Sequence, residues 1–149
     1  MSFFSSNEIT ASALSAQRLR MDVIAENIAN ANTTRAKDGG PYKRKTVIFE
    51  ERPDTTKFSA SLNDSLSRHV EGRGVRVRNI VEDDARGPLV YEPSHPDANE
   101  EGYVEMPNVN IVVEMVNMIS ASRSYEANVT ALTTARTMNS KTLEISGSA

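Results

Sequence analysis

The residues that could carry chemistry are few. The chain has two histidines, His69 and His95, and neither stands at a spacing typical of metal ligands. It has no cysteine, which excludes thiolate metal sites and cysteine nucleophiles. No strained turn surrounds a serine, as a Ser-His-Asp site would require. His95 lies between Ser94 and Pro96, where we expect a structural turn. The sequence therefore predicts no catalytic residues, no metal site and no enzymatic activity.

A short acidic stretch imitates the first half of a calcium loop. Asp97, Asn99 and Glu101 alternate and are followed by Gly102. Six residues later, where such a loop needs a bidentate glutamate, the chain has Asn108. We therefore expect an acidic surface turn in place of a cation site.

The basic residues of the run 43–45, with Arg35 and Lys37 nearby, could contact phosphate. Only Tyr42 offers a ring for stacking, and the whole chain carries a net charge of −3. Gly72 and Gly74 are too few to form a glycine-rich nucleotide loop. We expect neither a nucleic-acid partner nor a cofactor.

The turn-forming residues divide the chain into three parts. All six prolines lie within 41–107, and six of the seven glycines lie within 39–102. The flanks 6–31 and 109–146 contain neither residue, which predicts two long helices around an irregular middle. Short β-prone runs are expected at 47–49, 75–81, 89–91 and 103–105, and a mobile polar loop at about 54–74.

The predicted fold class is therefore mainly α with a small β/loop insert. The expected parts are an N-terminal axial helix (1–33), the insert (34–107) and a C-terminal axial helix (108–149), which form one structural unit within 149 residues. No stretch approaches the ~20 apolar residues that span a bilayer, so we expect a protein that does not cross the membrane. The first 30 residues lack the features of a cleaved secretory signal.

Apolar residues in both flanks recur at heptad spacing, which predicts that the two helices pair as a coiled coil. A second apolar line runs through Ile9, Ala16, Leu19 and Val23, so the first helix has more than one face to cover. The main seams comprise Leu14, Met21, Ile24 and Ile28 in the first flank, and Ile111, Met115, Met118, Tyr125, Val129, Leu132 and Leu143 in the second.

Charge in the middle part is polarised. Residues 35–78 include 11 basic and 6 acidic side chains, whereas residues 82–105 include 8 acidic and 1 basic. Such opposite patches could meet on neighbouring copies and fix their register, or could simply solvate the surface.

Several stretches resemble one family, the axial proteins of the bacterial flagellum, which are its rod, hook and hook-associated subunits. The shared signature is N-I-A-N-A-N-T at 27–33. Within the family, four further stretches are similar to a subunit of the proximal rod: G-G-P-Y-K-R-K (39–45), Y-E-P-S-H-P-D-A (91–98), G-Y-V-E-M-P-N-V-N (102–110) and E-M-V-N-M-I-S-A-S-R-S-Y-E-A-N-V (114–129).

The resemblance implies a structural subunit of the flagellar basal-body proximal rod, a helical drive shaft that transmits torque from the motor to the hook. It implies a periplasmic location in the rod, reached through the flagellar export apparatus without a cleaved signal. The implied partners are copies of the chain, other rod proteins, the export apparatus and basal-body components at the rod base.

The residues expected to form the coiled coil or a subunit interface lie in or next to the two flanks. Asn27, Asn30 and Asn32 could contact a partner or could only end the first helix and cap the next turn. The full set is Leu14, Met21, Ile24, Asn27, Ile28, Asn30, Asn32, Met115, Met118, Tyr125, Val129 and Leu132.

An alternative function is that of a soluble helical adaptor or chaperone of flagellar export. A chaperone needs no β-rich insert with polarised charge, so the middle part favours the rod subunit.

Overall fold

A computed structural model describes residues 3–36, 39–52 and 74–147 of the chain. The expected mobile loop lies outside these residues except for Gly74, and so do His69 and Lys37. Two long helices and four strands follow one another as α1 (Phe3–Ala29), β1 (Lys45–Glu51), β2 (Val75–Glu82), β3 (Leu89–Tyr91), β4 (Tyr103–Glu105) and α3 (Ile111–Gly147). The prediction of two helices flanking a small β-containing insert is confirmed.

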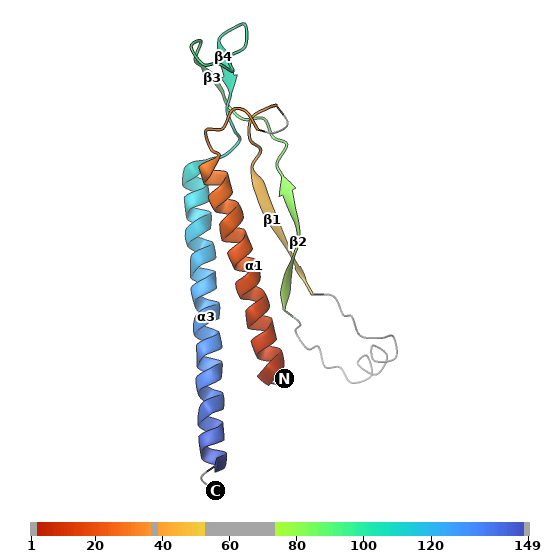
Figure 1. Cartoon of the computed structure of the whole chain (residues 1–149), viewed down its shortest axis with the longest axis vertical. Coiled ribbons are helices and arrows are strands. Elements are labelled where there is room, and N and C mark those ends of the chain that lie inside the picture. The colour runs from red at the N-terminus through yellow and green to blue at the C-terminus, as the bar shows by residue number, and fades with distance from the viewer. Residues whose placement is uncertain (1–2, 37–38, 53–73, 148–149) are drawn as a thin grey trace, which may run out of the picture.

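The two helices lie side by side and antiparallel, with both chain termini at the same end of the molecule (Figure 1). Helix α3 is ten residues longer than α1, 37 against 27, and its C-terminal end projects beyond the start of α1. The β1–β2 ribbon runs along α1, and the β3–β4 hairpin stands at the opposite end from the termini. No helix in the described ranges is apolar over a length that would cross a membrane.

Both sheets are two-stranded and antiparallel. In the first, Lys45 of β1 is opposite Glu82 of β2, and a bulge shifts the register between Ile48 and Phe49. Ser12 of α1 fastens this ribbon: its hydroxyl accepts a hydrogen bond from the Val75 amide at 3.1 Å. The second sheet pairs Leu89–Tyr91 with Tyr103–Glu105.

The start of α3 has a clear local cause. The side-chain oxygen of Asn110 accepts hydrogen bonds from the amides of Val112 (3.0 Å) and Val113 (3.2 Å). Asn110 is thus an N-cap that satisfies amides which have no partner inside the helix.

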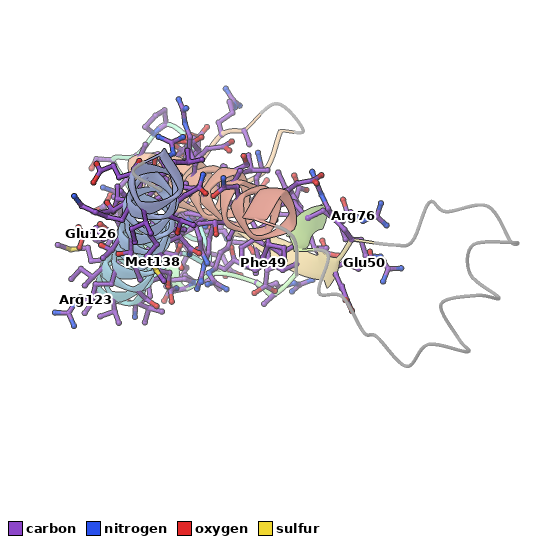
Figure 2. All side chains as sticks on the ribbon, turned by 90° about the horizontal axis from the view of Figure 1, so that it is seen from below. Phe49, Glu50, Arg76, Arg123, Glu126 and Met138 are labelled. Atoms are coloured by element: carbon purple, nitrogen blue, oxygen red, sulfur yellow. The ribbon has the colours of Figure 1, made fainter. Side chains whose placement is uncertain are left out.

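The core is small and lies where α1 meets the ribbon and α3. Its apolar members include Ala16, Val23 and Ile24 of α1 and Ala121 of α3. Side chains project outward all around the helix pair, as the view along the molecule shows (Figure 2). A two-helix layer has few interior positions, so many large apolar side chains of α3 stay exposed.

The face of α3 that packs on α1 differs from the predicted seam. Every second position of the seam agrees, and the positions between are shifted by one residue towards the N-terminus. Less exposed residues recur at spacings of four and three, and this stripe shares Met118, Tyr125 and Leu132 with the prediction. At the positions where the apolar pattern has Met115 and Val129, the structure turns Glu114 and Asn128 inward. The heptad pattern did not predict these two positions, because it considers only apolar residues. The full stripe is Glu114, Met118, Ala121, Tyr125, Asn128, Leu132, Ala135 and Asn139.

Gly87 allows the chain to pass closely beneath the end of β4. A Cβ atom at this position would overlap the carbonyl oxygen of Met106, which is rigid backbone. We therefore expect Gly87→Ala to lower the free energy of unfolding by about 1–3 kcal/mol, measured by urea denaturation of the full chain. Gly40→Ala is the matched control, because a Cβ atom there meets nothing within 4 Å. Equal stability of the two variants would contradict the close approach.

Candidate functional site

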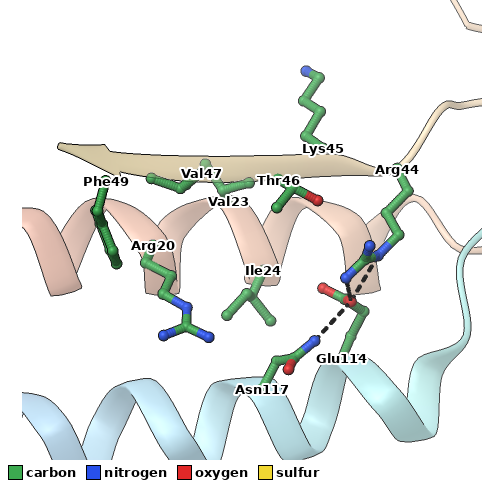
Figure 3. Close-up of a pocket in the computed structure, with 10 residues that line it drawn as sticks. All are labelled: Arg20, Val23, Ile24, Arg44, Lys45, Thr46, Val47, Phe49, Glu114 and Asn117. Atoms are coloured by element: carbon green, nitrogen blue, oxygen red, sulfur yellow. Dashed lines mark hydrogen bonds and ion pairs between the residues drawn. The ribbon is translucent and has the colours of Figure 1, made fainter. Parts of the chain in front are cut away.

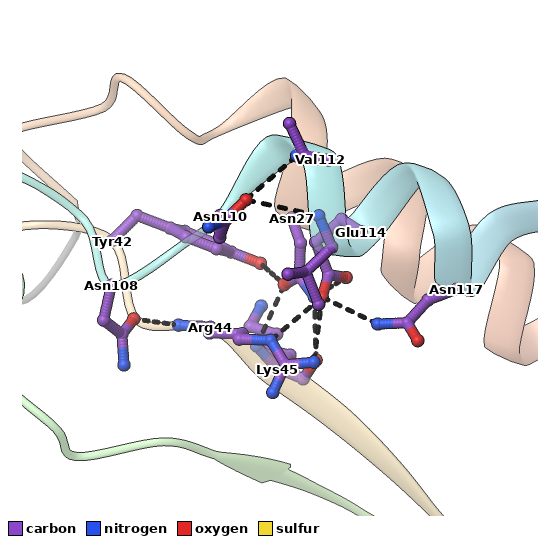
Figure 4. Close-up of polar contacts among 10 residues, drawn as sticks. Asn27, Tyr42, Arg44, Lys45, Asn108, Asn110, Val112, Glu114 and Asn117 are labelled. Atoms are coloured by element: carbon purple, nitrogen blue, oxygen red, sulfur yellow. Dashed lines mark hydrogen bonds and ion pairs between the residues drawn. The ribbon is translucent and has the colours of Figure 1, made fainter.

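A cluster of hydrogen-bonded polar side chains lies where α1 ends, β1 begins and α3 starts (Figure 4). We call it the polar junction and define it by Asn27, Tyr42, Arg44, Lys45 and Glu114. Three segments far apart in the sequence contribute to it. The junction therefore fixes how the two helices and the ribbon sit against one another.

Asn27 is the centre of the junction and is fully buried. Its amide nitrogen donates to the Lys45 carbonyl (2.8 Å) and to Glu114 Oε2 (3.0 Å). Its amide oxygen accepts from the Tyr42 hydroxyl and from the Lys45 amide, both at 2.9 Å. All four hydrogen-bonding positions of the side chain are thus used, which no other residue type of similar size could reproduce.

Glu114 is the buried charge of the junction, with 1% of its surface exposed. Arg44 donates to its Oε1 through Nε (3.0 Å) and Nη2 (2.8 Å), and Asn117 donates to the same oxygen at 3.2 Å. Burial alone raises the pKa of Glu114, but hydrogen bonds from Asn27 and Arg44 and the Arg44 charge outweigh it, so this pKa lies below its ordinary value. The carboxylate is therefore held ionised.

Tyr42 and Lys45 complete the junction on its open side. Burial, followed by the nearby Glu26 carboxylate, raises the pKa of the Tyr42 phenol, so the hydroxyl keeps the proton that it donates to Asn27. Lys45 binds Glu26 at 2.6 Å and lies 5.5 Å from the centre of the Tyr42 ring. The polar side chains of the junction bond to other groups of the same chain, so the role of the junction is to hold α1, β1 and α3 together.

Asn108 extends the junction to the segment before α3. Its side-chain oxygen accepts from the Arg44 amide at 2.7 Å, and its nitrogen donates to the Asp83 carbonyl at 3.0 Å. Arg44 is thereby oriented from both ends, at its backbone and at its guanidinium.

The three asparagines of the N-I-A-N-A-N-T stretch have three different environments. Asn27 joins the helices, as described above. Asn30 donates to the Glu26 carbonyl (2.9 Å) and accepts from the Thr33 hydroxyl (3.1 Å), so it closes the end of α1. Asn32 is exposed. Helix termination thus accounts for Asn30, whereas Asn27 links α1 to α3.

The other residues considered for chemistry serve the backbone or pair internally. His95 Nδ1 accepts from the Asp97 amide (3.1 Å), which confirms the structural turn. Asp97 binds the Thr34 hydroxyl, and the Asn99 side chain accepts from the amides of Glu101 and Tyr103. In the part of the chain that the structure describes, no group of three His, Cys, Asp or Glu side chains could hold a metal ion.

The three basic residues at 43–45 each form an ion pair within the chain. Lys43 pairs with Asp84, Arg44 with Glu114 and Lys45 with Glu26. Of these partners, Asp84 belongs to the acidic segment 82–105, and Arg35 also pairs with Asp97 of that segment at 3.5 Å, so part of the charge polarisation seen in the sequence is satisfied inside one chain.

Several of the expected interface residues remain available for a partner. Leu14, Met21, Ile28, Met118 and Tyr125 are half-buried, and so are Asn30 and Leu132. Only Ile24 and Asn27 of the set are fully buried. Met115 is 55% exposed and Val129 is 37% exposed, so neither is covered by α1.

Sequence reasoning missed the partners of Asn27, namely Tyr42, Lys45 and Glu114. A signal was present, since each of these residues lies in one of the stretches that resemble flagellar axial proteins. Their contact across 87 positions, from Asn27 to Glu114, could not be read from any one stretch.

Comparisons with known proteins match the same stretches. The family model described as "Flagella basal body rod protein" matches residues 8–37, and the model "Flagellar basal body rod FlgEFG protein C-terminal" matches residues 100–145. The chain is 49% identical to the flagellar basal-body rod protein FlgC of Bacillus subtilis over 97% of its own length and 99% of that protein. It is 45% identical to FlgC of Borreliella burgdorferi, covering 97% and 98% of the two chains. It is 44% identical to FlgC of Salmonella typhimurium, covering 93% of each.

Proposed function

The chain belongs to the FlgC family of flagellar basal-body rod proteins, and from this premise we propose how its structure serves the rod. It is a structural subunit of the rod of the flagellar basal body. The similarity over nearly the whole chain carries this conclusion, because it includes both helices and the insert between them. We propose that the subunit joins the proximal rod, within a helical shaft that transmits torque from the motor to the hook.

Exposed apolar side chains support an assembling role. Met115, Val116 and Ile119 of α3 have more than half of their surface exposed, and they follow one another along one side of the helix. Exposed apolar surface of this extent on one helix is typical of a surface that a partner covers. We propose that Met115 and Val129 face neighbouring subunits, together with the outward parts of Leu14, Met21, Ile28, Asn30, Asn32, Met118, Tyr125 and Leu132.

The helix pair is the proposed axial part of the subunit. The burial stripe of α3, with its alternating spacings of four and three, supports coiled-coil pairing of α1 with α3. We propose that parts 1–33, 34–107 and 108–149 act as one structural unit, with the polar junction as the point that joins them.

The proposed partners are further copies of the chain, other rod proteins and components at the rod base. We propose that the chain reaches the periplasmic rod through the flagellar export apparatus without a cleaved signal, and that its role is structural and not catalytic. The adaptor or chaperone alternative is not favoured, because the relatives are rod proteins by name over almost their full length.

The test is to purify intact hook–basal bodies from cells that carry this chain and to quantify it by mass spectrometry. Stable recovery at several copies per particle is expected. Its absence from intact particles, with the chain found soluble beside export components, would refute the proposal and support the adaptor.

A further inference from the structure

A groove lies beside the polar junction (Figure 3). It lies between α1, β1 and α3 and has a volume of about 380 Å³. Val23 and Ile24 of α1 and Val47 and Phe49 of β1 give it apolar walls, and the Arg44–Glu114 pair closes one end. Side chains from three elements thus surround a space that none of the described residues fills.

Arg20 supplies the groove with an unbalanced positive charge. The other two cations that line it are matched, Arg44 by Glu114 and Lys45 by Glu26. Arg20 has no hydrogen-bond or ion-pair partner among the described residues, although its guanidinium points into the groove (Figure 3). A guanidinium beside apolar walls binds a carboxylate well, because the surroundings weaken competition from water. The chemistry of the groove therefore suits an apolar surface that carries one acid.

The outer face of α3 offers apolar side chains and one acid, with the exposed Arg123 one turn before that acid. Its exposed apolar residues include Met115, Val116 and Ile119, and Glu126 follows Ile119 by two helical turns on the same side. Glu126 lies on the side of α3 turned away from α1 (Figure 2). Its carboxylate contacts only the Ser122 hydroxyl at 3.4 Å among the described residues, so it remains free to pair with a cation.

We propose that this groove binds the outer face of α3 from a second copy of the chain, with Glu126 of one copy paired to Arg20 of the next. On β1, the half-buried side chains of Val47 and Phe49 line the groove with Arg20, so Ile119 or Val129 of the incoming helix can cover this apolar wall while the charges meet. The groove and the outer face of α3 are different surfaces. A pair of bound copies therefore still has one free groove and one free outer face. Such a head-to-tail contact propagates and generates a helical assembly. The inference rests on the proposed rod function and adds the contacting surfaces to it.

Charge exchange tests the contact in cells that depend on this chain for their rods. Arg20→Glu and Glu126→Arg should each reduce its recovery in hook–basal bodies by about tenfold or more, because two like charges then face each other. The double variant should recover to within about threefold of the wild type, since the pair is restored in reverse. Circular dichroism of each purified variant checks that the helices still form.

Cysteine cross-linking tests the same contact directly, because the natural chain has no cysteine. The variant with Arg20→Cys and Glu126→Cys should form disulfide-linked multimers of the chain in assembled rods. The control pairs Glu126→Cys with Arg18→Cys, which lies two residues earlier on the opposite side of α1 and should stay uncross-linked.

The outcomes separate the inference from the proposed function. If the wild-type chain is missing from hook–basal bodies, the proposed function fails. If the wild type is present and Arg20→Glu is recovered equally, only the groove contact is overturned. If Arg20→Glu blocks recovery but the double variant is not rescued and no cross-linked multimers form, the groove binds a different rod protein, and the inference of a second copy is wrong.

Discussion

Replacing Asn27 by aspartate should destabilise the folded chain by at least about 3 kcal/mol at neutral pH. The new oxygen would stand where the Asn27 nitrogen now donates to the Lys45 carbonyl and to Glu114, so both acceptors would lose their donor. A second carboxylate would also lie about as close to Glu114 as the amide nitrogen does now, at 3.0 Å in a buried place. Two such carboxylates cannot both stay ionised at low cost.

The pH dependence of this variant carries a distinct signature. One of the two carboxyl groups should take up a proton with a pKa above its ordinary value, so the stability deficit should shrink as the pH is lowered from about 7 towards 5. Urea denaturation of the full chain at several pH values measures this. Asn32→Asp is the matched control, because Asn32 is exposed in the same motif and the change should stay within about 0.5 kcal/mol. Equal effects at both positions would mean that the junction does not hold the helices together.

Glu114→Gln should lower the free energy of unfolding by about 2–4 kcal/mol at neutral pH, because it leaves the Arg44 guanidinium without its counter-charge. Arg44 keeps about a quarter of its side chain in contact with solvent (28% exposed), which limits the loss. The glutamine can still accept from Asn27, so packing and shape are preserved. Glu101→Gln, at an exposed position, is the control and should be nearly neutral.

The acid limb of the stability curve tests the same residue in the wild type. The pKa of Glu114 is lowered in the folded state, so its stabilising contribution is complete above the ordinary value of 4.5 and is lost as the pH falls through the folded-state pKa. The wild type should therefore lose stability below about pH 4.5 more steeply than Glu114→Gln, which has no carboxyl to titrate at this position. Parallel curves for the two proteins would show that Glu114 is not held ionised by the junction.

The junction also explains why a rod subunit would retain a buried ion pair where apolar residues could pack. An ion pair with several hydrogen bonds has one arrangement, whereas apolar faces of long helices can slide by a turn. Arg44 and Glu114 thus fix the register of α3 against β1, and Asn27 fixes α1 to both. A shaft that bears torque needs such a fixed register between its helices.

The helices and strands of this protein follow from local features of its sequence. Proline and glycine are confined to the middle, so the helices at the two ends and the short strands between them follow from local backbone preferences. The stretches that resemble flagellar axial proteins also identified the family, since those residues stand close together along the chain. Local chemistry was enough for both results.

Which helix faces contact one another depends on contacts between distant segments of the folded chain. Heptad counting selected Met115 and Val129, yet one residue earlier the structure buries Glu114 and half-buries Asn128. Glu114 is buried because Arg44 and Asn27 donate hydrogen bonds to its carboxylate. Those partners lie 70 and 87 residues away in the sequence. A pattern of neighbouring residues cannot predict which distant side chain will contact Glu114. The groove beside Arg20 exists for the same reason, since its walls belong to three elements that only folding brings together.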